Sequence, residues 1–225
     1  MQIIPVIDLK GGIVVHAVGG DRQHYQAIHR HSTLTAGSDI DTVLQGFLAL
    51  HAFGVFYIAD IDAISGTGNH YAVIDRIVEQ WPEIEFWVDS GSSLADLATG
   101  HDKRKTVIGT ESQSGRAMRS EYDFILSLDY KQQMPAGDAA WFSDCRYWPE
   151  RVIVMTLNRV GSNLGPDFDQ LAALRASNPD TRLIAAGGVR DSRDLDRLES
   201  IGIDAVLVAT ALHSGAINAH DLKNR

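Results

Sequence analysis

Cysteine and long apolar runs are the features that this sequence most clearly lacks. Cys145 is the single cysteine, so no disulfide can form within the chain, and its surroundings SDCRYWPE place no obvious base beside it. We interpret it as an incidental thiol rather than a nucleophile. No stretch approaches the roughly 20 apolar residues that a membrane span needs. The N-terminus leads into the apolar run IIPVI without a basic segment, so we expect no signal peptide, no membrane partner and a cytoplasmic location.

Positive charge is scarce as well. The chain has 20 Lys and Arg residues against 29 Asp and Glu residues, which gives a formal net charge of −9. An acidic surface repels phosphate backbones, so nucleic acid is a poor partner. A phosphorylated small molecule would need a local exception, such as backbone N–H groups or helix N-termini. The length of 225 residues fits one domain spanning 1–225.

Short apolar runs, each followed by a small or polar residue, recur eight times along the chain. Such near-continuous runs favour parallel strands that are buried on both faces. The predicted strands are Ile3–Ile7, Val55–Ala59, Glu85–Val88, Lys105–Ile108, Phe124–Leu128, Val152–Met155, Arg182–Ala185 and Ala205–Val208. Between them, helical patterns predict helices at Thr42–Phe53, Tyr71–Glu79, Phe168–Ala176 and Ser192–Ser200.

Eight strands alternating with helices indicate an α/β fold of the (β/α)8 TIM-barrel type. The structural alternative is a doubly wound open sheet, which normally has five or six strands and often a glycine fingerprint after the first. Lys10-Gly11-Gly12 is not that fingerprint, so we favour the barrel. We interpret the segment Gly12–His16 as a β-turn extension rather than a binding strand.

The two halves of the predicted barrel echo each other, which predicts half-barrel pseudo-twofold symmetry. Asp8 ends the first strand, and Asp129 ends the fifth. The segments after the third, fourth, seventh and eighth strands are Asp89-Ser90-Gly91, Gly109-Thr110, Ala186-Gly187-Gly188 and Ala209-Thr210. Two similar sites facing each other across the barrel mouth would suit a substrate with a phosphate at each end.

Asp8 and Asp129 are the main candidates for chemistry. A charged residue at the C-terminal end of a barrel strand faces the active-site mouth. Two carboxylates on opposite strands would flank a bound molecule and suit proton transfer. The alternative is that each aspartate caps the turn or helix that follows it.

Glycine and small residues after the strands are candidates for phosphate binding, since they let the backbone approach a phosphate closely. The candidates are Gly91, Gly109, Thr110, Gly187, Gly188, Ala209 and Thr210. The alternative is a tight turn that requires glycine. Thr156, at the end of the sixth strand, could bind substrate or its own backbone.

Two further polar clusters have a structural interpretation. We expect Asp60, Asp62 and Asn69 to order the loop after the second strand. His24, His29 and His31 lie close together, but their spacing is not that of a zinc motif, so we expect no metal.

The chain resembles the family of histidine-biosynthesis isomerases, which includes HisA and the cyclase HisF. The resemblance rests on IIPVIDLKGGIVVHAVGGD, YIADIDAISGTGN, VIGTES, LSLDYK, IVMTLNRVGS, LIAAGGVRD and VLVATAL, in the family's order. It implies a barrel of the ribulose-phosphate-binding type, an Amadori rearrangement of a substrate with two phosphates, and no metal or organic cofactor. By position, Asp8 matches the general base, Asp129 the general acid and Thr156 a substrate-holding threonine. Gly109, Gly187 and Gly188 match phosphate-cradle positions.

The chain departs from the family pattern in the recognition loops. After the third strand the family usually has three glycines, an apolar residue and arginine, whereas this chain has Asp89-Ser90-Gly91-Ser92-Ser93. The arginine is missing, and the added carboxylate would repel a phosphate. After the eighth strand Gly-Arg-Ala is replaced by Ala209-Thr210-Ala211, and His16 replaces an arginine. These departures predict a substrate other than the standard histidine-pathway intermediate.

Two functional hypotheses follow. The first is an isomerase or related lyase that acts on a phosphorylated, sugar-derived small molecule by acid/base proton transfer. The second is a non-catalytic barrel that binds a small molecule or a partner protein. Some relatives accompany pterin and furan cofactor pathways of one-carbon metabolism, which the resemblance offers as a setting for either hypothesis. The oligomeric state stays open.

Overall fold

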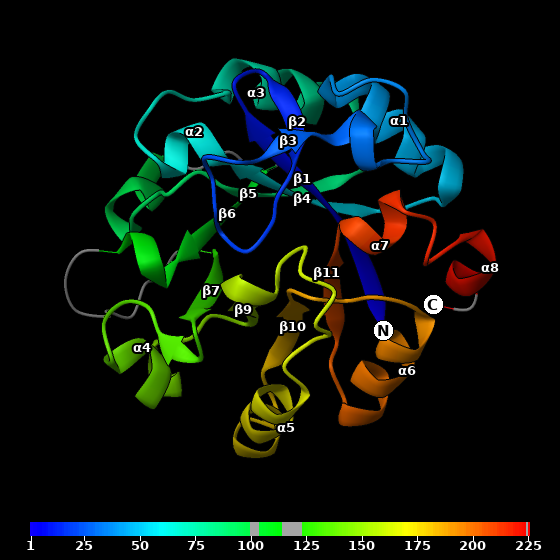
Figure 1. Ribbon diagram of the computed structural model, residues 1–225. Coiled ribbons are helices and arrows are strands. Elements are labelled where there is room, and N and C mark those ends of the chain that lie inside the picture. The colour runs from blue at the N-terminus through cyan, green and yellow to red at the C-terminus, as the bar shows by residue number, and fades with distance from the viewer. Residues whose placement is uncertain (100–103, 114–122, 224) are drawn as a thin grey trace.

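A computed structural model describes residues 1–99, 104–113, 123–223 and 225, and its centre is a closed barrel of eight parallel strands (Figure 1). These strands are β1 (Gln2–Lys10), β4 (Val55–Asp60), β5 (Glu85–Asp89), β6 (Arg104–Gly109), β7 (Ile125–Lys131), β9 (Arg151–Thr156), β10 (Arg182–Ala186) and β11 (Ala205–Val208). Each pairs with the next, and β11 pairs with β1 through Gln2↔Ala205 to Pro5↔Val208. The predicted barrel is confirmed, and the open sheet is excluded because the first and last strands are joined.

Four helices of ten or eleven residues lie outside the barrel, close to where the sequence predicts them. They are α1 (Ile40–Leu50), α3 (Tyr71–Gln80), α5 (Phe168–Ser177) and α6 (Ser192–Ile201). The other described helical segments are α2 (Ile61–Ile64), α4 (Ala140–Ser143), α7 (Thr210–His213), α8 (Ala219–Leu222) and the 3-10 turns η1 (Ile28–His31), η2 (Leu94–Thr99), η3 (Thr110–Ser112), η4 (Cys145–Tyr147) and η5 (Leu157–Arg159). No helix in the described part of the chain is both long and apolar enough to span a membrane.

Short antiparallel strands extend β1 and β7. The strand β2 (Ile13–His16) pairs with β1 through Lys10↔Ile13 and continues to β3 (Gln26–Ala27), which confirms the predicted extension. The strand β8 (Met134–Pro135) pairs with the end of β7. Both extensions follow the carboxyl ends of barrel strands. The loop between β2 and β3 therefore lies at the mouth of the barrel.

Alternation along the strands divides the core into an inner and an outer layer. Ile4 of β1, Trp87 of β5 and Ile125 of β7 pack together inside the barrel. Ile7, Phe86 and Leu126 pack between the strands and the helices. Successive side chains of a strand point to opposite faces, so every second residue of each strand faces the interior. The inner layer fills the barrel and leaves the carboxyl ends of the strands to form the site.

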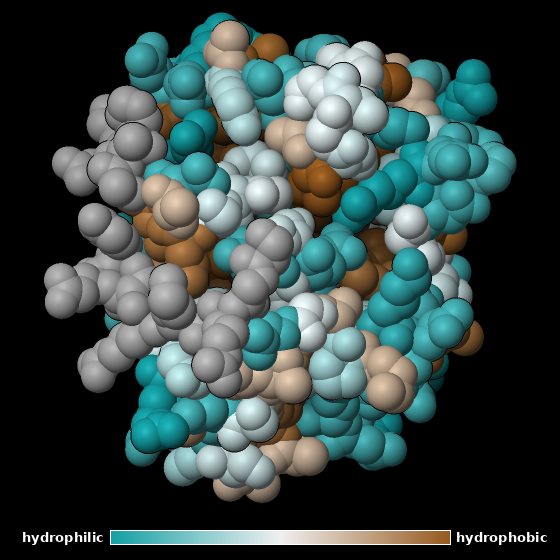
Figure 2. Space-filling view, turned by 90° about the vertical axis from the view of Figure 1, so that its left-hand side faces the viewer, coloured by the Kyte–Doolittle hydropathy of each residue, from teal (hydrophilic) through white to brown (hydrophobic). Residues whose placement is uncertain are grey.

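Apolar side chains are dispersed on the face of the molecule that Figure 2 shows. Figure 2 shows one face of the molecule, on which the described residues are mostly hydrophilic and the apolar ones form small separate groups. Burial of apolar area is thus concentrated in the two core layers, as the continuous apolar runs of the strands predict.

Candidate active site

Asp8 and Asp129 face each other across the mouth of the barrel. Their strands, β1 and β7, are separated by three others on one side and three on the other, so they lie half-way around the ring. Asp8 is an even number of positions from the inward-facing Ile4, and Asp129 is an even number from Ile125, so both point inward. Both are buried and line the same pocket. The structure brings the two predicted carboxyl groups together as the sequence suggests.

Asp129 is held by uncharged donors. Its Oδ1 accepts a hydrogen bond from the Ser127 hydroxyl at 2.7 Å, and its Oδ2 accepts one from the Glu111 N–H at 3.0 Å. Burial raises the pKa of Asp129 to about 7, and the negative charges of Asp89 and Glu111 add to the rise, while these two hydrogen bonds oppose it. A carboxyl group that gains and loses a proton near neutrality is suited to acid/base chemistry.

Asp8 stands in a different environment. Its side chain is 9% exposed and has no hydrogen-bond or ion-pair partner in the described structure. Burial alone raises the pKa of Asp8 to about 7. Its backbone is fixed on both sides, because it pairs with Val15 of β2 and with Ala59 of β4. The hairpin and the barrel therefore fix the position of a carboxyl group whose oxygens are left free for a ligand.

Asp89, at the end of β5, is a third carboxyl group in the pocket. Its Oδ2 accepts a hydrogen bond from the Tyr57 hydroxyl at 3.1 Å, and its Oδ1 accepts one from the Gly91 N–H at 3.0 Å. Burial raises the pKa of Asp89 to about 6. The sequence marks this residue only as a departure from a family pattern. The alternation from Trp87 to Asp89 would have placed it inside the barrel.

The loop that follows β2 covers part of the mouth. Ala17, Gly20, Arg22 and Tyr25 of this loop line the pocket. The Arg22 guanidinium makes an ion pair with Glu111 at 2.5 Å, which joins the loop to the segment after β6. The mouth is therefore bordered, not filled, by this loop, and an open pocket remains between the strands.

Gly187 and Gly188 line the opposite side of the pocket, but the fold itself explains why they are glycine. Their φ angles are 103° and 88°, which L side chains rarely adopt. A Cβ on Gly187 would lie 2.6 Å from the Thr156 carbonyl oxygen, and a Cβ on Gly188 would lie 2.5 Å from that of Gly165. These glycines thus permit close packing of two loops, and glycine identity alone is not evidence for phosphate binding.

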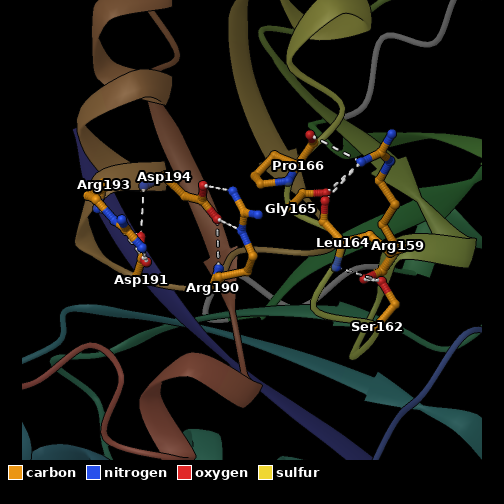
Figure 3. A network of polar contacts seen from close by, with 9 residues as sticks. All are labelled: Arg159, Ser162, Leu164, Gly165, Pro166, Arg190, Asp191, Arg193 and Asp194. Atoms are coloured by element: carbon orange, nitrogen blue, oxygen red, sulfur yellow. Dashed lines mark hydrogen bonds and ion pairs between the residues drawn. The ribbon is translucent and has the colours of Figure 1, made fainter.

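Two arginines beside this glycine turn are engaged in structural contacts (Figure 3). Arg159 donates to the carbonyl oxygens of Leu164, Gly165 and Pro166, at 2.8 Å in the case of Gly165. Arg190 forms a bidentate ion pair with Asp194, in which its Nε and Nη2 donate to the two carboxylate oxygens at 2.9 and 2.7 Å. Figure 3 shows both guanidinium groups directed at these partners. They hold the loops after β9 and β10 in place.

The whole-chain similarity decides the family. The family model described as Histidine biosynthesis protein matches residues 2–134 and 139–218. The chain belongs to this histidine biosynthesis family. The resemblance predicted from the sequence motifs is thereby confirmed.

Several relatives cover nearly the full length of this chain at low identity. An uncharacterized protein of Methanocaldococcus jannaschii is 28% identical over 233 residues, which cover 100% of this chain and 99% of that protein. A 1-(5-phosphoribosyl)-5-((5-phosphoribosylamino)methylideneamino) imidazole-4-carboxamide isomerase of Listeria innocua is 26% identical over 258 residues, covering 99% of this chain and 97% of that protein. The isomerase of the same name from Clostridium kluyveri is 25% identical over 243 residues, covering 97% and 96%.

The predicted phosphate-binding residues of this family member divide into two groups. Gly187, Gly188, Ala209 and Thr210 line the pocket, at the ends of β10 and β11. Gly91, Gly109 and Thr110, at the ends of β5 and β6, are not among the residues that line it. The Thr110 hydroxyl instead accepts a hydrogen bond from the Asp129 N–H at 2.9 Å. The two halves that look alike in sequence therefore differ in which of these residues line the pocket.

Thr156 does not line the pocket either. Its neighbour Met155 does, because Met155 is an even number of positions from the inward-facing Ile153. Thr156 shares the outward direction of Val152 and Val154, and it is buried at 3% exposure. The described structure gives no contact that supports a role for its hydroxyl, and the role stays a prediction from the family resemblance.

The remaining polar candidates have structural contacts. Asp60 accepts hydrogen bonds from the N–H groups of Ala63 and His70, and Asp62 accepts one from the Gly11 N–H, so both order loops as predicted. His29 contacts the Ser38 hydroxyl. Within the described ranges, no three His, Cys, Asp or Glu side chains are grouped so that they could hold a metal ion. Cys145 is exposed and unpaired.

Proposed function

We propose that this protein is an acid/base isomerase for a phosphorylated, sugar-derived small molecule, with Asp8 and Asp129 as the groups that move protons. The observation that carries the proposal is the facing pair itself: two buried carboxyl groups on opposite strands line one pocket. Burial raises the pKa of both to about 7, so each can hold or release a proton near neutrality.

The family resemblance supplies the direction of the proton transfers. At Asp129, a proton passes to the sugar ring oxygen and the ring opens. As the bond between C1 and the ring oxygen breaks, the nitrogen lone pair forms a C=N bond at C1. The Asp8 carboxylate then accepts the proton from C2, the C–H electrons form C1=C2, and the C=N electrons return to nitrogen. The resulting enolamine becomes the aminoketose when C1 gains a proton and the C2 hydroxyl loses one. The two groups lie on opposite sides of the pocket, which is the arrangement that this transfer requires. The Listeria and Clostridium relatives are named as isomerases of an imidazole carboxamide compound that carries two phosphoribosyl groups.

Phosphate would bind where Gly187, Gly188, Ala209 and Thr210 line the pocket. These residues carry no charge themselves, so a phosphate there would contact backbone N–H groups and the Thr210 hydroxyl. Arg190 holds the loop that carries Gly187 and Gly188, and Arg159 holds the adjacent loop after β9, so both guanidinium groups contact protein atoms. A preorganised backbone can bind an anion without ordering a long side chain.

Hydrogen exchange at carbon tests the proposal even while the exact substrate is unidentified. Phosphorylated aldoses, aminoaldoses and the imidazole carboxamide compound in the relatives' name would be incubated with the protein in D2O, and NMR would follow replacement of C–H by C–D. Asp8→Asn and Asp129→Asn are each expected to slow the exchange by about 10²-fold or more. Unchanged exchange in both variants would overturn the proposed mechanism.

A matched control separates chemistry from damage to the fold. Asp62→Asn makes the same substitution near the same end of the barrel, where Asp62 contacts Gly11 and does not line the pocket. We expect this variant to retain its exchange rate. If no sugar phosphate raises the thermal midpoint of the unaltered protein, the non-catalytic alternative is favoured, because a ligand that binds the folded state must stabilise it.

A further inference from the structure

Negative charge in the pocket is not matched by positive charge. Asp8, Asp89 and Asp129 all line it, together with Glu111. Arg22 is the only lysine or arginine among the lining residues of the described structure, and it already forms an ion pair with Glu111 at 2.5 Å. None of the three aspartates makes an ion pair with a lysine or arginine among those residues, although Arg22 exerts a longer-range attraction on Asp89. Buried carboxylates in proteins are usually paired with a cation or well supplied with hydrogen bonds.

Two of these groups lie close to each other at Gly109. The Oδ2 atoms of Asp129 and Asp89 lie 3.0 and 3.7 Å from the point where a side chain on Gly109 would begin. In the described structure the hydrogen bonds that they accept come from uncharged groups, namely the Ser127, Tyr57 and Thr110 hydroxyls and backbone N–H donors. Repulsion from Asp89 contributes to the raised pKa of Asp129. A positive charge between the two carboxylates would relieve that repulsion.

Asp8 provides an independent indication of a ligand. It is nine-tenths buried, it lines the pocket, and its carboxyl oxygens have no partner in the described structure. An unpartnered carboxyl group in such a place costs free energy unless a ligand supplies a donor. Asp8 is on β1, opposite the strand of Asp129, so a ligand that contacts both lies in the centre of the mouth.

The other side of the pocket has the opposite character. Gly187, Gly188 and Ala209 carry no charge. They follow β10 and β11, which lie across the ring from β5 and β6. One side of the pocket can therefore accept an anion, and the side with Asp89 and Asp129 repels one.

We infer that the substrate carries a single phosphate, bound beside Gly187 and Gly188, and a protonated amine that is held by Asp89. This inference rests on the proposed function and specifies its substrate class: a phosphorylated amine instead of a bisphosphate. An ammonium group has three N–H donors and no acceptor, so it is suited to a carboxylate that lacks a cationic partner. Hydrogen bonds between charged groups are about twice as strong as neutral ones.

Three phosphate esters distinguish a phosphorylated amine from a neutral monophosphate and from a bisphosphate as the preferred ligand. Glucosamine 6-phosphate and glucose 6-phosphate differ by an amine in place of a hydroxyl, and fructose 1,6-bisphosphate carries a second phosphate. Calorimetric titration of the unaltered protein is expected to show the amino sugar binding about tenfold more tightly than the other two. The inference does not require that any of the three is turned over.

Variants locate the preference at Asp89. Asp89→Asn removes one negative charge with little change in shape and is expected to reduce the preference for the amino sugar to about threefold or less. Asp62→Asn, which lies outside the pocket, is expected to leave the preference unchanged. If the Asp89 variant fails to fold, the comparison of the three esters on the unaltered protein still decides.

The outcomes separate the two proposals. Equal binding of the amino sugar and the neutral sugar, or tighter binding of the bisphosphate, would overturn the amine site and leave the isomerase proposal standing. Binding of none of the three esters would overturn the amine site, and the exchange assay in D2O with the wider set of compounds would still decide the isomerase proposal. A tenfold preference that survives in Asp89→Asn would assign the amine to a different place in the pocket and overturn the site described here.

Discussion

Asp8 is a residue whose charge the folded protein does little to stabilise. The carboxyl group is buried, and no donor in the described structure contacts it. Burial raises its pKa from 3.8 to about 7. Between these two pH values the folded state keeps a proton that the unfolded chain releases, so stability falls as the pH rises. The loss is complete above about pH 7, where the folded state must also ionise a buried group.

Asp8→Asn is therefore expected to stabilise the protein in a pH-dependent manner. The free energy of unfolding of the variant should exceed that of the unaltered protein by more at pH 8 than at pH 5. The increase in the free energy of unfolding caused by the substitution should be larger at pH 8 than at pH 5 by about 1 kcal/mol or more, since one pKa unit corresponds to about 1.4 kcal/mol. Urea titrations at both pH values measure it. The same effect at pH 5 and pH 8 would contradict the raised pKa of Asp8, and Asp62→Asn serves as the comparison.

At the scale of elements, the end of β6 makes room for the carboxyl groups of its neighbours. Gly109 has φ −84°, which any residue can adopt, so the turn itself does not require glycine there. A Cβ at this position would lie 3.0 Å from the Asp129 Oδ2, which is a tight contact. The close approach of β6 to the β7 carboxylate explains this glycine better than a phosphate cradle does.

Gly109→Ala is expected to fold normally and to lose activity. The methyl group should displace the Asp129 carboxyl group, and we expect the exchange rate to fall by about tenfold or more, because small displacements of reacting groups slow catalysis. Gly54→Ala is the control, since a Cβ at Gly54 meets nothing within 4 Å. Thermal unfolding and the D2O exchange assay are measured together. Retained activity in Gly109→Ala would show that Asp129 tolerates the shift.

At the scale of the whole molecule, electrostatics opposes the arrival of anions. The net charge is −9, and among the described residues the pocket is lined by four carboxyl groups against one guanidinium. Charges of the same sign slow association, and salt screens the repulsion. The molecule is thus expected to bind phosphorylated ligands faster as ionic strength increases.

Stopped-flow association of glucose 6-phosphate measures this dependence. Raising the salt concentration from about 0.02 M to about 0.2 M should increase the association rate constant by a few-fold. Glucosamine 6-phosphate, with its compensating positive charge, should respond less. A steep decrease with salt would instead reveal a local positive field at the mouth, which the described lining residues do not provide.

The site can be predicted from the sequence only in part, and the reason is geometric. Asp8 and Asp129 are conspicuous because polar residues at strand ends stand out after apolar runs. Asp89 obeys the same rule, but in the sequence it stands out only as a departure from the family pattern. Thr156 is a candidate by its position at a strand end, although its neighbour Met155 is the residue that faces inward. The position of a strand end in sequence does not state the direction of a side chain, whereas alternation from an inward-facing core residue does.

The sequence by itself determined the eight strands, their order and the family, because each strand is a continuous apolar run and the motifs between them keep the family's order. It also determined that the strand ends of the two halves resemble each other. Only the tertiary structure decided which strand ends of the two halves line the pocket. The ring brings Asp8, Asp89 and Asp129 to one pocket whose described lining holds no free cation, and leaves Gly187 and Gly188 opposite them. Closure of the barrel creates these neighbours, since residues from distant strands meet only after β11 pairs with β1.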